Sequence, residues 1–567
     1  MKKYIFDNSN LAESYSGVTT PLTFSFARYV YQEVYKSFCD MMGVSPKVIE
    51  KNKDMFPNMV VFIGYRMYYD LINWYRLVSF LPGYKFNRRF LEKMLGVEKQ
   101  HDHSSDTRYN FWQRYFIDFP LLIWQFIKIV FNFIFMGHLV KNFNKNFDKT
   151  YLQSDKLDLK NKSSLKLREI YLSLTTDLTS RWKVPIANDL AVMVSTGIAD
   201  TLVAKWLKDE SVYNYLRLSS QKSLVSLDPG LEIARIIKNI RDDGELLELF
   251  KNQEALFVWQ SLKTDHSKNS VSLAIFDYLK NFGSRSPSEL KLEAITLKED
   301  PRSFIIFLQN NLSDNIHQEN KNKEVRESRA FKDLFIIKKG ILNFILKWAR
   351  NSIDRREETR FKRTLIFGFS RKVFLQIGAN LKNEGILNKQ RDIFYLEVEQ
   401  IFSVLDGEIT KDKIQEIINK KKEEIELWQE IDLPRRIETN KLIKELELEL
   451  KSVQIDNKKI TNLKGVVASQ TKECLVEGRA LLMPNFDNKA NFNNKILIAR
   501  QTDPGWTMVF PLVKALVIER GGMLSHAAIV ARELGIPCII GVEGAISCIK
   551  DDSLIKLDLS TGKIMYE

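Results

Sequence analysis

Residues 520–542 read RGGMLSHAAIVARELGIPCIIGV, and they decide the fold of the C-terminal part of the chain. The two glycines predict a turn, and Ser525 is a good N-cap for an apolar, alanine-rich helix that begins at His526. Gly535 should end this helix, and residues 538–542 should form a buried strand. The stretch therefore predicts a histidine at a helix N-terminus.

A histidine at this place suits phosphate chemistry. Unpaired backbone N–H groups and the positive end of the helix dipole converge there and favour an anion. A neutral imidazole is a nucleophile near pH 7, and the helix end would stabilise a phosphoryl group attached to it. We predict that His526 is a catalytic phosphoryl carrier. The alternative is a histidine that only caps or packs, and a ring that no outside group can reach would contradict the carrier role.

The segment also resembles the swivelling phosphohistidine domain of enzymes related to phosphoenolpyruvate synthase and pyruvate phosphate dikinase. In that family the histidine of a (T/S)-x-HAA-IxARE-GIP motif is phosphorylated. The matching residues here are Ser525, His526, Ala527, Ala528, Arg532, Glu533, Gly535, Ile536 and Pro537. The resemblance implies that the phosphate is bound by Gly522, Ser525, Arg500 and Thr502, because Arg500 and Thr502 begin a loop that the relatives share.

Length and composition indicate a folded protein of several domains. The chain has 567 residues, of which 44% are hydrophobic and 28% charged. A net charge of +14 is compatible with nucleic acid or a membrane surface, but lysine alternates with glutamate and asparagine along predicted helices. No DNA-binding motif is present, so we expect no nucleic-acid partner.

The cysteines and the N-terminus indicate a cytoplasmic location. The four cysteines show no CxxC pair, and Cys538 and Cys548 lie in apolar runs, so we expect buried thiols there and neither disulfides nor a metal site. The first residues lack the apolar region of a secretion signal. From 116 to 140 the chain is very apolar, but charged and polar residues interrupt it, which favours a buried or interfacial helix over a spanning one. A helix that lies on a membrane is the minority interpretation, and membrane contact is not expected.

The N-terminal stretch carries a second resemblance. Residues 4–27 are polar and turn-prone up to Pro21, which should begin a helix that continues toward Met41. The stretch resembles the start of the substrate-binding domain of rifampicin phosphotransferase and its relatives, which have an N-(I/L)-x-E-x-(Y/F)-x-G-V-x-(T/S)-P-L motif. Residues 55–280 show helical spacing, and we assign their tryptophans to packing. Asp189 should cap an apolar helix or face a substrate, with capping as the first choice.

A third stretch, FGSRSPSELKLEAITLKEDP from residue 282 to 301, resembles the (Y/F)-G-H-R-G-P-G-E-x-(D/E)-L loop of the same relatives. Ser284 stands where those proteins have histidine, and Ser286 and Ser288 replace glycines. If the family histidine assists the acceptor, this chain lacks that group.

Two charged residues of this loop are retained. The guanidinium of Arg285 could receive a transferring phosphoryl group bidentately, and its alternative role is a salt bridge with Glu289. The candidate substrate-binding residues are thus Arg285, Glu289 and Asp189.

Further helices should complete the middle of the chain. Between Asp300 and Lys347 the apolar residues Ile337, Ile341, Ile345 and Trp348 repeat on one helical face. Residues 355–401 resemble the closing portion of the same substrate-binding domain, with Arg356, Glu357 and Arg360 among the matches. We expect these residues to hold the domain together, with an arginine-rich helix that faces a phosphate as the alternative.

The C-terminal third changes character twice. Residues 407–460 are rich in glutamate and lysine, which predicts solvated helices and a tether for the last domain. From Lys464 onward, short apolar runs separated by Gly, Pro and Asp predict strands over 465–469, 477–483, 495–499, 515–519, 538–542 and 554–558. We expect a large, mostly α-helical domain followed by a small α/β (swivelling β/β/α) domain. The predicted boundaries are 1–405 for the helical acceptor domain, 406–463 for a charged helical linker and 464–567 for the mobile phosphohistidine domain.

The function that follows is a phosphotransferase component. No glycine-rich phosphate loop is visible, so we expect a separate ATP-grasp protein to supply the phosphoryl group, with ATP and Mg²⁺ bound on that partner and no cofactor on this chain. The helical domain would hold a small organic acceptor. The alternative is a non-catalytic binding or scaffold protein, which Ser284 favours and the intact His526 segment opposes.

Overall fold

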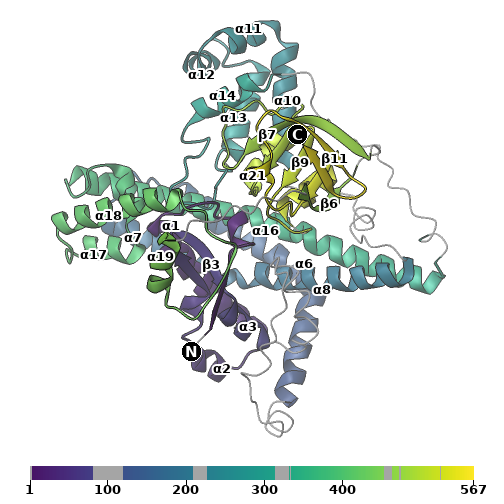
Figure 1. Ribbon diagram of the computed structural model, residues 1–567. Helices are drawn as coiled ribbons and strands as arrows, with labels where there is room; N and C mark the ends of the chain where they lie inside the picture. The colour runs from purple at the N-terminus through teal and green to yellow at the C-terminus, as the bar shows by residue number, and fades with distance from the viewer. Residues whose placement is uncertain are drawn as a thin grey trace. The chain divides into compact units, whose positions relative to one another are not determined.

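The computed structural model describes residues 3–80, 119–207, 227–285, 287–312, 331, 334–452, 463–470, 474–523 and 525–566. The chain forms two compact units. Unit 1 comprises Met1–Ser220, Lys291–Glu293 and Arg326–Ile455, and unit 2 comprises Gln221–Leu290, Ala294–Val325 and Asp456–Glu567. The chain is mostly helical with a small C-terminal α/β region, as the sequence predicted (Figure 1). The predicted domain boundaries stay a prediction.

Unit 1 is built on long helices. Pro21 occupies the first helical position of α1, where its missing N–H is not needed, so the predicted start of this helix is confirmed. The longest helix, α16, has 48 residues and packs against α8. The helices of unit 1 are α1 (Pro21–Met41), α2 (Pro46–Lys51), α3 (Leu71–Ser79), α6 (Phe119–Asp155), α7 (Ser164–Arg181), α8 (Lys183–Leu207), α16 (Ile336–Asn383), α17 (Val398–Leu405), α18 (Lys411–Gln429) and α19 (Ile443–Ser452), with short 3₁₀ turns η1 (Leu11–Glu13), η2 (Phe56–Asn58) and η4 (Gln390–Tyr395).

A four-stranded antiparallel sheet joins the two ends of unit 1. Its strands are β1 (Tyr4–Asp7), β2 (Val60–Ile63), β3 (Arg66–Asp70) and β4 (Arg436–Thr439), in the order β2-β3-β1-β4. Ile5 pairs with Glu438 across β1 and β4, so the N-terminus lies beside residues more than 400 positions away. The sheet therefore fixes the 3₁₀ turn η1, which follows β1, against the body of unit 1.

The predicted tether differs from the structure. Helix α18 and strand β4 belong to unit 1, and Ile418, Trp428 and Leu433 are buried there. Trp428 and Leu433 pack on the sheet with Tyr68 and Ile63, and the apolar residues of α18 lie at helical spacing among the lysines and glutamates. The charged composition describes only the solvent face, so 411–452 is not a solvated tether. Residues 453–462, where the expected linker continues, lie outside the described residues.

The apolar repeat noted on α16 is not uniformly buried, because Ile345 and Trp348 are half-buried. Ile337 and Ile341 are exposed, whereas Leu342, Leu346 and Ala349 are buried. Both sets repeat at helical spacing, and the neighbouring helices decide which one is covered.

Of the two expectations for residues 116–140, a buried or an interfacial helix, α6 does not fit the buried one. Its N-terminal half turns an apolar face to solvent, and Trp124 is 54% exposed, so its assignment to packing is wrong. This face consists of Ile123, Trp124, Phe126, Ile127, Val130, Phe131, Ile134 and Phe135. By length and composition alone, two stretches, Ile123–Asp155 and Ser164–Leu207, could cross a membrane, a test that core helices of soluble proteins also pass. The expectation of no membrane contact stays a prediction.

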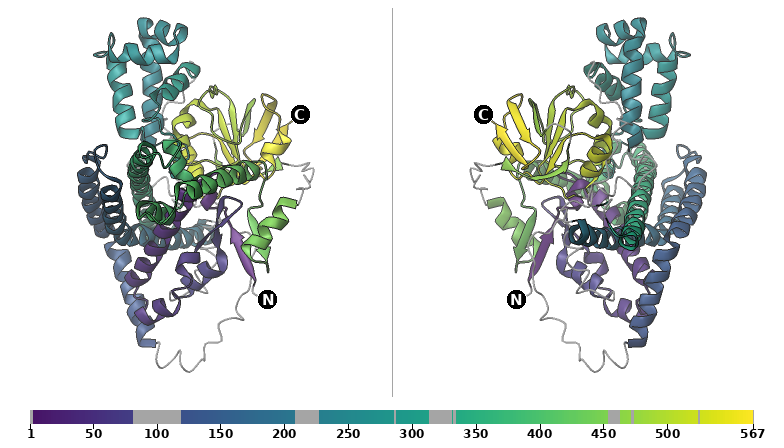
Figure 2. Two further views of the ribbon diagram at one scale, coloured as in Figure 1. Left: turned by 90° about the vertical axis from the view of Figure 1, so that its left-hand side faces the viewer. Right: turned by 90° about the vertical axis from the view of Figure 1, so that its right-hand side faces the viewer.

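Unit 2 combines a group of helices with the α/β region. In both views of Figure 2 the helices of residues 228–310 gather beside the sheet. They are α10 (Asp228–Asp242), α11 (Gly244–Asn252), α12 (Ala255–Lys263), α13 (Ser270–Phe282) and α14 (Pro301–Asn310).

The sheet of unit 2 contains all six predicted strands. Its eight strands run in the order β5-β12-β11-β7-β8-β9-β10-β6, and β7, β8, β9 and β10 are parallel neighbours. Gly465 joins β5 to β6, which lie at opposite ends of this order, and a Cβ there would meet the Ile540 carbonyl oxygen at 2.5 Å. Only glycine permits that approach. The strands are β5 (Leu463–Lys464), β6 (Val466–Ser469), β7 (Leu475–Met483), β8 (Ile496–Ala499), β9 (Ala515–Ile518), β10 (Cys538–Ile540), β11 (Leu554–Asp558) and β12 (Lys563–Tyr566).

Candidate functional site

The helix that carries the histidine forms as predicted. Helix α20 (His526–Leu534) begins directly after Ser525, whose hydroxyl accepts a hydrogen bond from the backbone N–H of Ala528 at 3.4 Å. Gly535 ends the helix in the left-handed conformation at φ 69°. Arg532 Nε donates to the Ala468 carbonyl at 2.8 Å and so fixes the helix to β6.

The histidine lies at the carboxyl edge of the parallel strands. Strands β8 and β9 end side by side, because the N–H of Glu519 donates to the Ala499 carbonyl and that of Arg520 donates to the Arg500 carbonyl, at 2.9 and 2.7 Å. Helix α20 follows this edge after a short loop. In open α/β sheets this edge is where ligands bind, so two arginines and a helix N-terminus share the place expected for an anion.

Two buried polar groups in the loop after β8 have no hydrogen-bond partner within the described part of the chain. They are the hydroxyl of Thr502 and the side-chain oxygen of Gln501, and both residues are less than 10% exposed. A buried polar atom without a partner is costly, and a phosphate oxygen would satisfy the Thr502 hydroxyl. This observation supports the prediction that Thr502 binds phosphate.

The other predicted phosphate-binding residues lie around the same edge. Gly522 is exposed in the turn before α20, Ser525 is buried as the N-cap, and Arg500 is half-buried beside β9. Their role in binding phosphate stays a prediction.

The imidazole of His526 is enclosed, which contradicts the expectation of an accessible ring. His526 has 0% exposed surface. The ring lies under the 3₁₀ segment η5 (Pro504–Leu512), where its Nε2 is 2.8 Å from the Thr507 hydroxyl. The sequence gives little sign of this cover, because residues 504–512 show only a turn signal, TDPGW, and an apolar run.

The hydrogen bonds of Thr507 favour one tautomer of the ring. Its hydroxyl is also 2.8 Å from the carbonyl oxygen of Pro504, which can only accept. A hydroxyl has a single proton, so it donates to Pro504 and accepts from the Nε2–H of His526. In the neutral ring the lone pair then lies on Nδ1.

Helix α10 holds the cover in place. A Cβ on Gly230 would meet the backbone carbonyl oxygen of Thr507 at 2.6 Å, so α10 packs directly on η5. This approach requires glycine and explains why a glycine stands in the first turn of the helix. The enclosure of His526 thus depends on α10 and η5 together.

The loop with the third resemblance contacts the loop after β8 in unit 2. The backbone N–H of Ser288 donates to Asp503 at 2.7 Å, and Asp503 in turn accepts from the N–H of Gly505. Ser288 adopts φ 62°, the left-handed region that glycine prefers, at a position where the resembling proteins have glycine. Ser286 lies outside the described residues.

The candidate substrate-binding residues fall in two different units. Arg285 and Glu289 are buried in unit 2. Burial raises the pKa of Asp228, and the nearby positive charge of Arg285 acts in the opposite direction. Asp189 lies in unit 1, so the three residues do not form one site within a unit.

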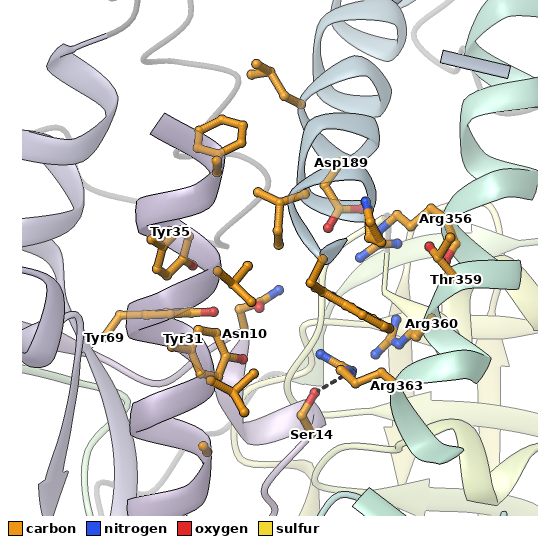
Figure 3. A pocket seen from close by; sticks show the side chains of 18 of the residues that line it. Asn10, Ser14, Tyr31, Tyr35, Tyr69, Asp189, Arg356, Thr359, Arg360 and Arg363 are labelled. Carbon is orange, nitrogen blue, oxygen red and sulfur yellow. Dashed lines mark hydrogen bonds and ion pairs between the residues drawn. The ribbon is translucent and has the colours of Figure 1, made fainter. Parts of the chain in front are cut away.

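Unit 1 contains a cavity of about 210 Å³, and Asp189 lines it. Asp189 lies inside α8, seven residues into the unbroken run of the helix, so the prediction that it caps a helix is wrong. In Figure 3 tyrosines from α1 and β3 face three arginines from α16 across the cavity. The polar lining residues are Asn10, Glu13, Ser14, Tyr15, Tyr31, Tyr35, Tyr69, Asp189, Arg356, Thr359, Arg360 and Arg363.

Two of these arginines are paired with carboxylates. Arg356 Nε is 3.4 Å from Asp189 Oδ1, and Arg360 Nη2 is 3.5 Å from Glu13 Oε2. Burial raises the pKa of both carboxyl groups, although the neighbouring arginines lower it. The matched residues Arg356 and Arg360 line the cavity, and the expectation that they hold the domain together stays a prediction.

The comparisons with known proteins agree with this architecture. Residues 492–562, which include α20 and the strand edge, match the family described as PEP-utilising enzyme, mobile domain. Over these residues the chain is similar to that family. Residues 186–357 match the rifampicin phosphotransferase fourth domain, a segment that includes Asp189, Arg285 and Arg356.

Several curated relatives share one name. Rifampicin phosphotransferase of Bacillus subtilis is 23% identical over 442 residues, which cover 73% of this chain and 48% of the relative. That of Bacillus cereus is 25% identical over 397 residues, or 67% of this chain and 44% of the relative. Phosphoenolpyruvate synthase of Aeropyrum pernix is 39% identical over 101 residues, 18% of this chain and 11% of the relative. The chain thus spans about half the length of the rifampicin phosphotransferases that it matches.

The matched segment 492–562 contains two residues that the sequence patterns did not single out. Arg520 opens the stretch 520–542, but its position beside Arg500 follows only from strand pairing. Thr507 carries no motif signal, and only the tertiary structure brings it to His526.

Proposed function

We propose that this chain is the carrier and acceptor part of a phosphotransferase. His526 receives a phosphoryl group from ATP bound, together with Mg²⁺, by a separate ATP-grasp partner, and passes it to an organic acceptor held by unit 1. The observation that carries the proposal is the placement of His526 at the N-terminus of α20, at the carboxyl edge of a parallel sheet, in a matched mobile domain.

Two transfer steps move the phosphoryl group. In the first, an imidazole nitrogen forms a bond to phosphorus while the bond from phosphorus to the nucleotide oxygen breaks. In the second, an acceptor oxygen forms a bond to the same phosphorus, the nitrogen–phosphorus bond breaks and the acceptor proton passes to a base. The N–H groups of α20, the Thr502 hydroxyl and the cations Arg500 and Arg520 would stabilise the phosphoryl oxygens in both steps.

The enclosed ring gives the movement a physical role. An enclosed phosphohistidine is protected from water, whereas transfer to a donor or acceptor requires contact. We therefore propose that η5 and α10 separate from α20 before each transfer, and that the mobile domain swivels between the two partners.

Labelling by ATP tests this proposal. The full chain is incubated with an ATP-grasp partner and ATP labelled at the β or γ phosphorus, and protein-bound label is measured with and without acid treatment. The expected result is acid-labile label that His526→Ala abolishes. A matched control is His266→Ala in the same unit, which should keep the label. If wild-type His526 stays unlabelled from both phosphorus positions while the partner binds ATP, the carrier proposal is wrong.

A second candidate function is a non-catalytic scaffold. It is favoured by Ser284 at the position of the family histidine and by the enclosed His526 ring. A scaffold should keep its cellular function when His526 is replaced by alanine, because binding surfaces remain. Loss of function in His526→Ala with an intact fold would exclude the scaffold.

A further inference from the structure

The cavity of unit 1 has two chemically different sides. One side is apolar and aromatic, with the rings of Phe38, Trp74 and Trp182 and the side chains of Leu190 and Met193. The other side is formed by α16, whose arginines point toward the tyrosines of α1 in Figure 3. A pocket with an apolar body and a few polar groups at one end is typical of a site for a small organic molecule.

The polar side of the cavity carries more arginines than carboxylates. Arg356 and Arg360 each lie near a carboxylate that lines the cavity. Arg363 is placed differently: its Nη2 donates a 3.3 Å hydrogen bond to the neutral Ser14 hydroxyl, although its charge also lowers the pKa of Asp189. The Nε of Arg363 is buried and has no hydrogen-bond partner in the part of the chain that the structure describes. The Arg363 side chain lines the cavity, and a guanidinium at a cavity wall favours an anionic ligand.

The size of the cavity limits the ligand. At about 210 Å³ it is larger than the cavity of roughly 150 Å³ that holds benzene in another protein, and it is small for a drug-sized compound. The space suits one or two rings, or a short apolar chain, with a single charged group.

Sequence segments far apart converge on this cavity. Glu13 and Tyr15 come from the N-terminal motif, Asp189 from α8 and Arg356 from the closing portion of the helical region. The first and last of these segments are ones through which the chain resembles substrate-binding domains. Their convergence supports this cavity as a ligand-binding site.

We propose that the cavity of unit 1 binds an organic anion with an aromatic or compact apolar body, and that Arg363 pairs with its anionic group. The role of this ligand as the phosphoryl acceptor rests on the proposed function, whereas its binding does not. The anionic group is a carboxylate or a phosphate, both of which a guanidinium binds through two parallel hydrogen bonds.

Binding of three matched probes to the full chain tests the inference. Calorimetry with 2-naphthoate, 2-naphthyl phosphate and the neutral 2-naphthamide compares a carboxylate, a phosphate and no charge on the same ring system. We expect at least one anion to bind at one molecule per chain and about tenfold more tightly than the amide, the value of one charge-assisted hydrogen bond. The tighter anion identifies the preferred head group. Equal binding of anions and amide, or no binding of any probe, would overturn the inference.

Two variants and one control assign the binding to the cavity. Arg363→Gln should weaken both anions about tenfold and leave the amide unchanged. Val30→Phe, which adds a ring to the cavity wall, should weaken all probes. Arg168→Gln removes an arginine that pairs with Asp406 elsewhere in unit 1 and should leave binding unchanged. Unaltered anion binding in Arg363→Gln and Val30→Phe alike would show that the probes bind elsewhere and would contradict the inference.

His526→Ala separates this inference from the proposed function. Because the cavity lies in unit 1, the variant should bind the anions as the wild type does. If the wild type binds the anions but His526 is not labelled by ATP, the carrier function is contradicted and the proposed ligand site is still supported. A labelled His526 without anion binding would overturn the pocket alone.

Discussion

At the scale of single residues, the backbone conformation of Ser288 is strained. The residue adopts φ 62°, a conformation that costs an L-residue about 1–2 kcal/mol and glycine almost nothing. Its backbone N–H bond to Asp503 keeps this conformation. The chain therefore tolerates strain beside the loop that precedes the candidate carrier site.

We predict that Ser288→Gly stabilises unit 2. The gain should be about 0.5–1 kcal/mol, because the steric cost outweighs the extra freedom of glycine in the unfolded chain. Urea unfolding of the full chain measures the change. Ser267→Gly, in a turn of the same unit without a positive φ, should be neutral or destabilising. A loss of stability in Ser288→Gly would show that the serine side chain contributes more than its strain costs.

The hydroxyl of Thr507 should stabilise the fold by accepting the Nε2–H proton of His526. Thr507→Val leaves the buried Nε2–H of His526 without its acceptor, which should cost about 1–3 kcal/mol. Thr507→Ser keeps the hydroxyl and should stay close to the wild type. Denaturant unfolding measures the stabilities, and nitrogen NMR of the labelled imidazole reports whether Nε2 carries the proton. A wild-type spectrum with the proton on Nδ1 would refute the assigned tautomer.

At the scale of elements, α10 packs on η5, the segment that covers His526. The two elements can approach so closely because Gly230 has no side chain. A Cβ at this position would overlap the Thr507 carbonyl and crowd Pro511. The sequence pattern of residues 520–542 predicts neither η5 nor α10 as a cover for the histidine.

Gly230→Ala should therefore loosen this cover. We expect a stability loss of about 1–3 kcal/mol from overpacking and faster modification of His526 by diethyl pyrocarbonate. Gly244→Ala is the matched control, because Gly244 opens α11 in the same unit and a Cβ there meets nothing within 4 Å. Mass spectrometry of the modified peptide measures the rate. Equal rates in both variants would show that α10 does not limit access.

The two halves of α6 should respond differently to substitution. Phe131→Glu lies on the exposed apolar face and should change the free energy of unfolding by no more than about 0.5 kcal/mol. Phe143→Ala removes a ring that is 4% exposed and contacts Trp182, and it should cost about 3–5 kcal/mol. Thermal and urea unfolding compare them. A large loss in Phe131→Glu would show that this face is covered in solution.

At the scale of the whole molecule, buried carboxyl groups should make stability depend on pH. Glu13 and Asp189 both have raised pKa values in the fold, so the folded state binds protons more tightly than the unfolded chain. Their contribution is complete below the unfolded pKa values of 4.5 and 3.8 and is lost as pH rises through the folded values. Asp189→Asn should therefore flatten the decline in stability above about pH 4, and Glu13→Gln should do the same. Unfolding measured across pH checks this, and an unchanged slope in both variants would contradict it.

The sequence by itself determined the elements that depend on local signals. The N-cap Ser525, the left-handed Gly535 and the alternation of apolar runs with turns located α20 and the strands around it, because caps and strand periodicity involve neighbouring residues. The same holds for the start of α1 at Pro21. The residues alone therefore suffice to place the candidate carrier at a helix N-terminus.

Only the tertiary structure decided what surrounds these elements. The enclosure of His526 by η5 and α10, the packing of 411–452 into unit 1 and the cavity that gathers Glu13, Asp189 and Arg363 all join segments that lie far apart in the chain. Charge composition misled the interpretation of 411–452, because a helix with one apolar face looks solvated when its residues are only counted. Such contacts depend on which faces meet after the elements have formed, and no local pattern records that choice.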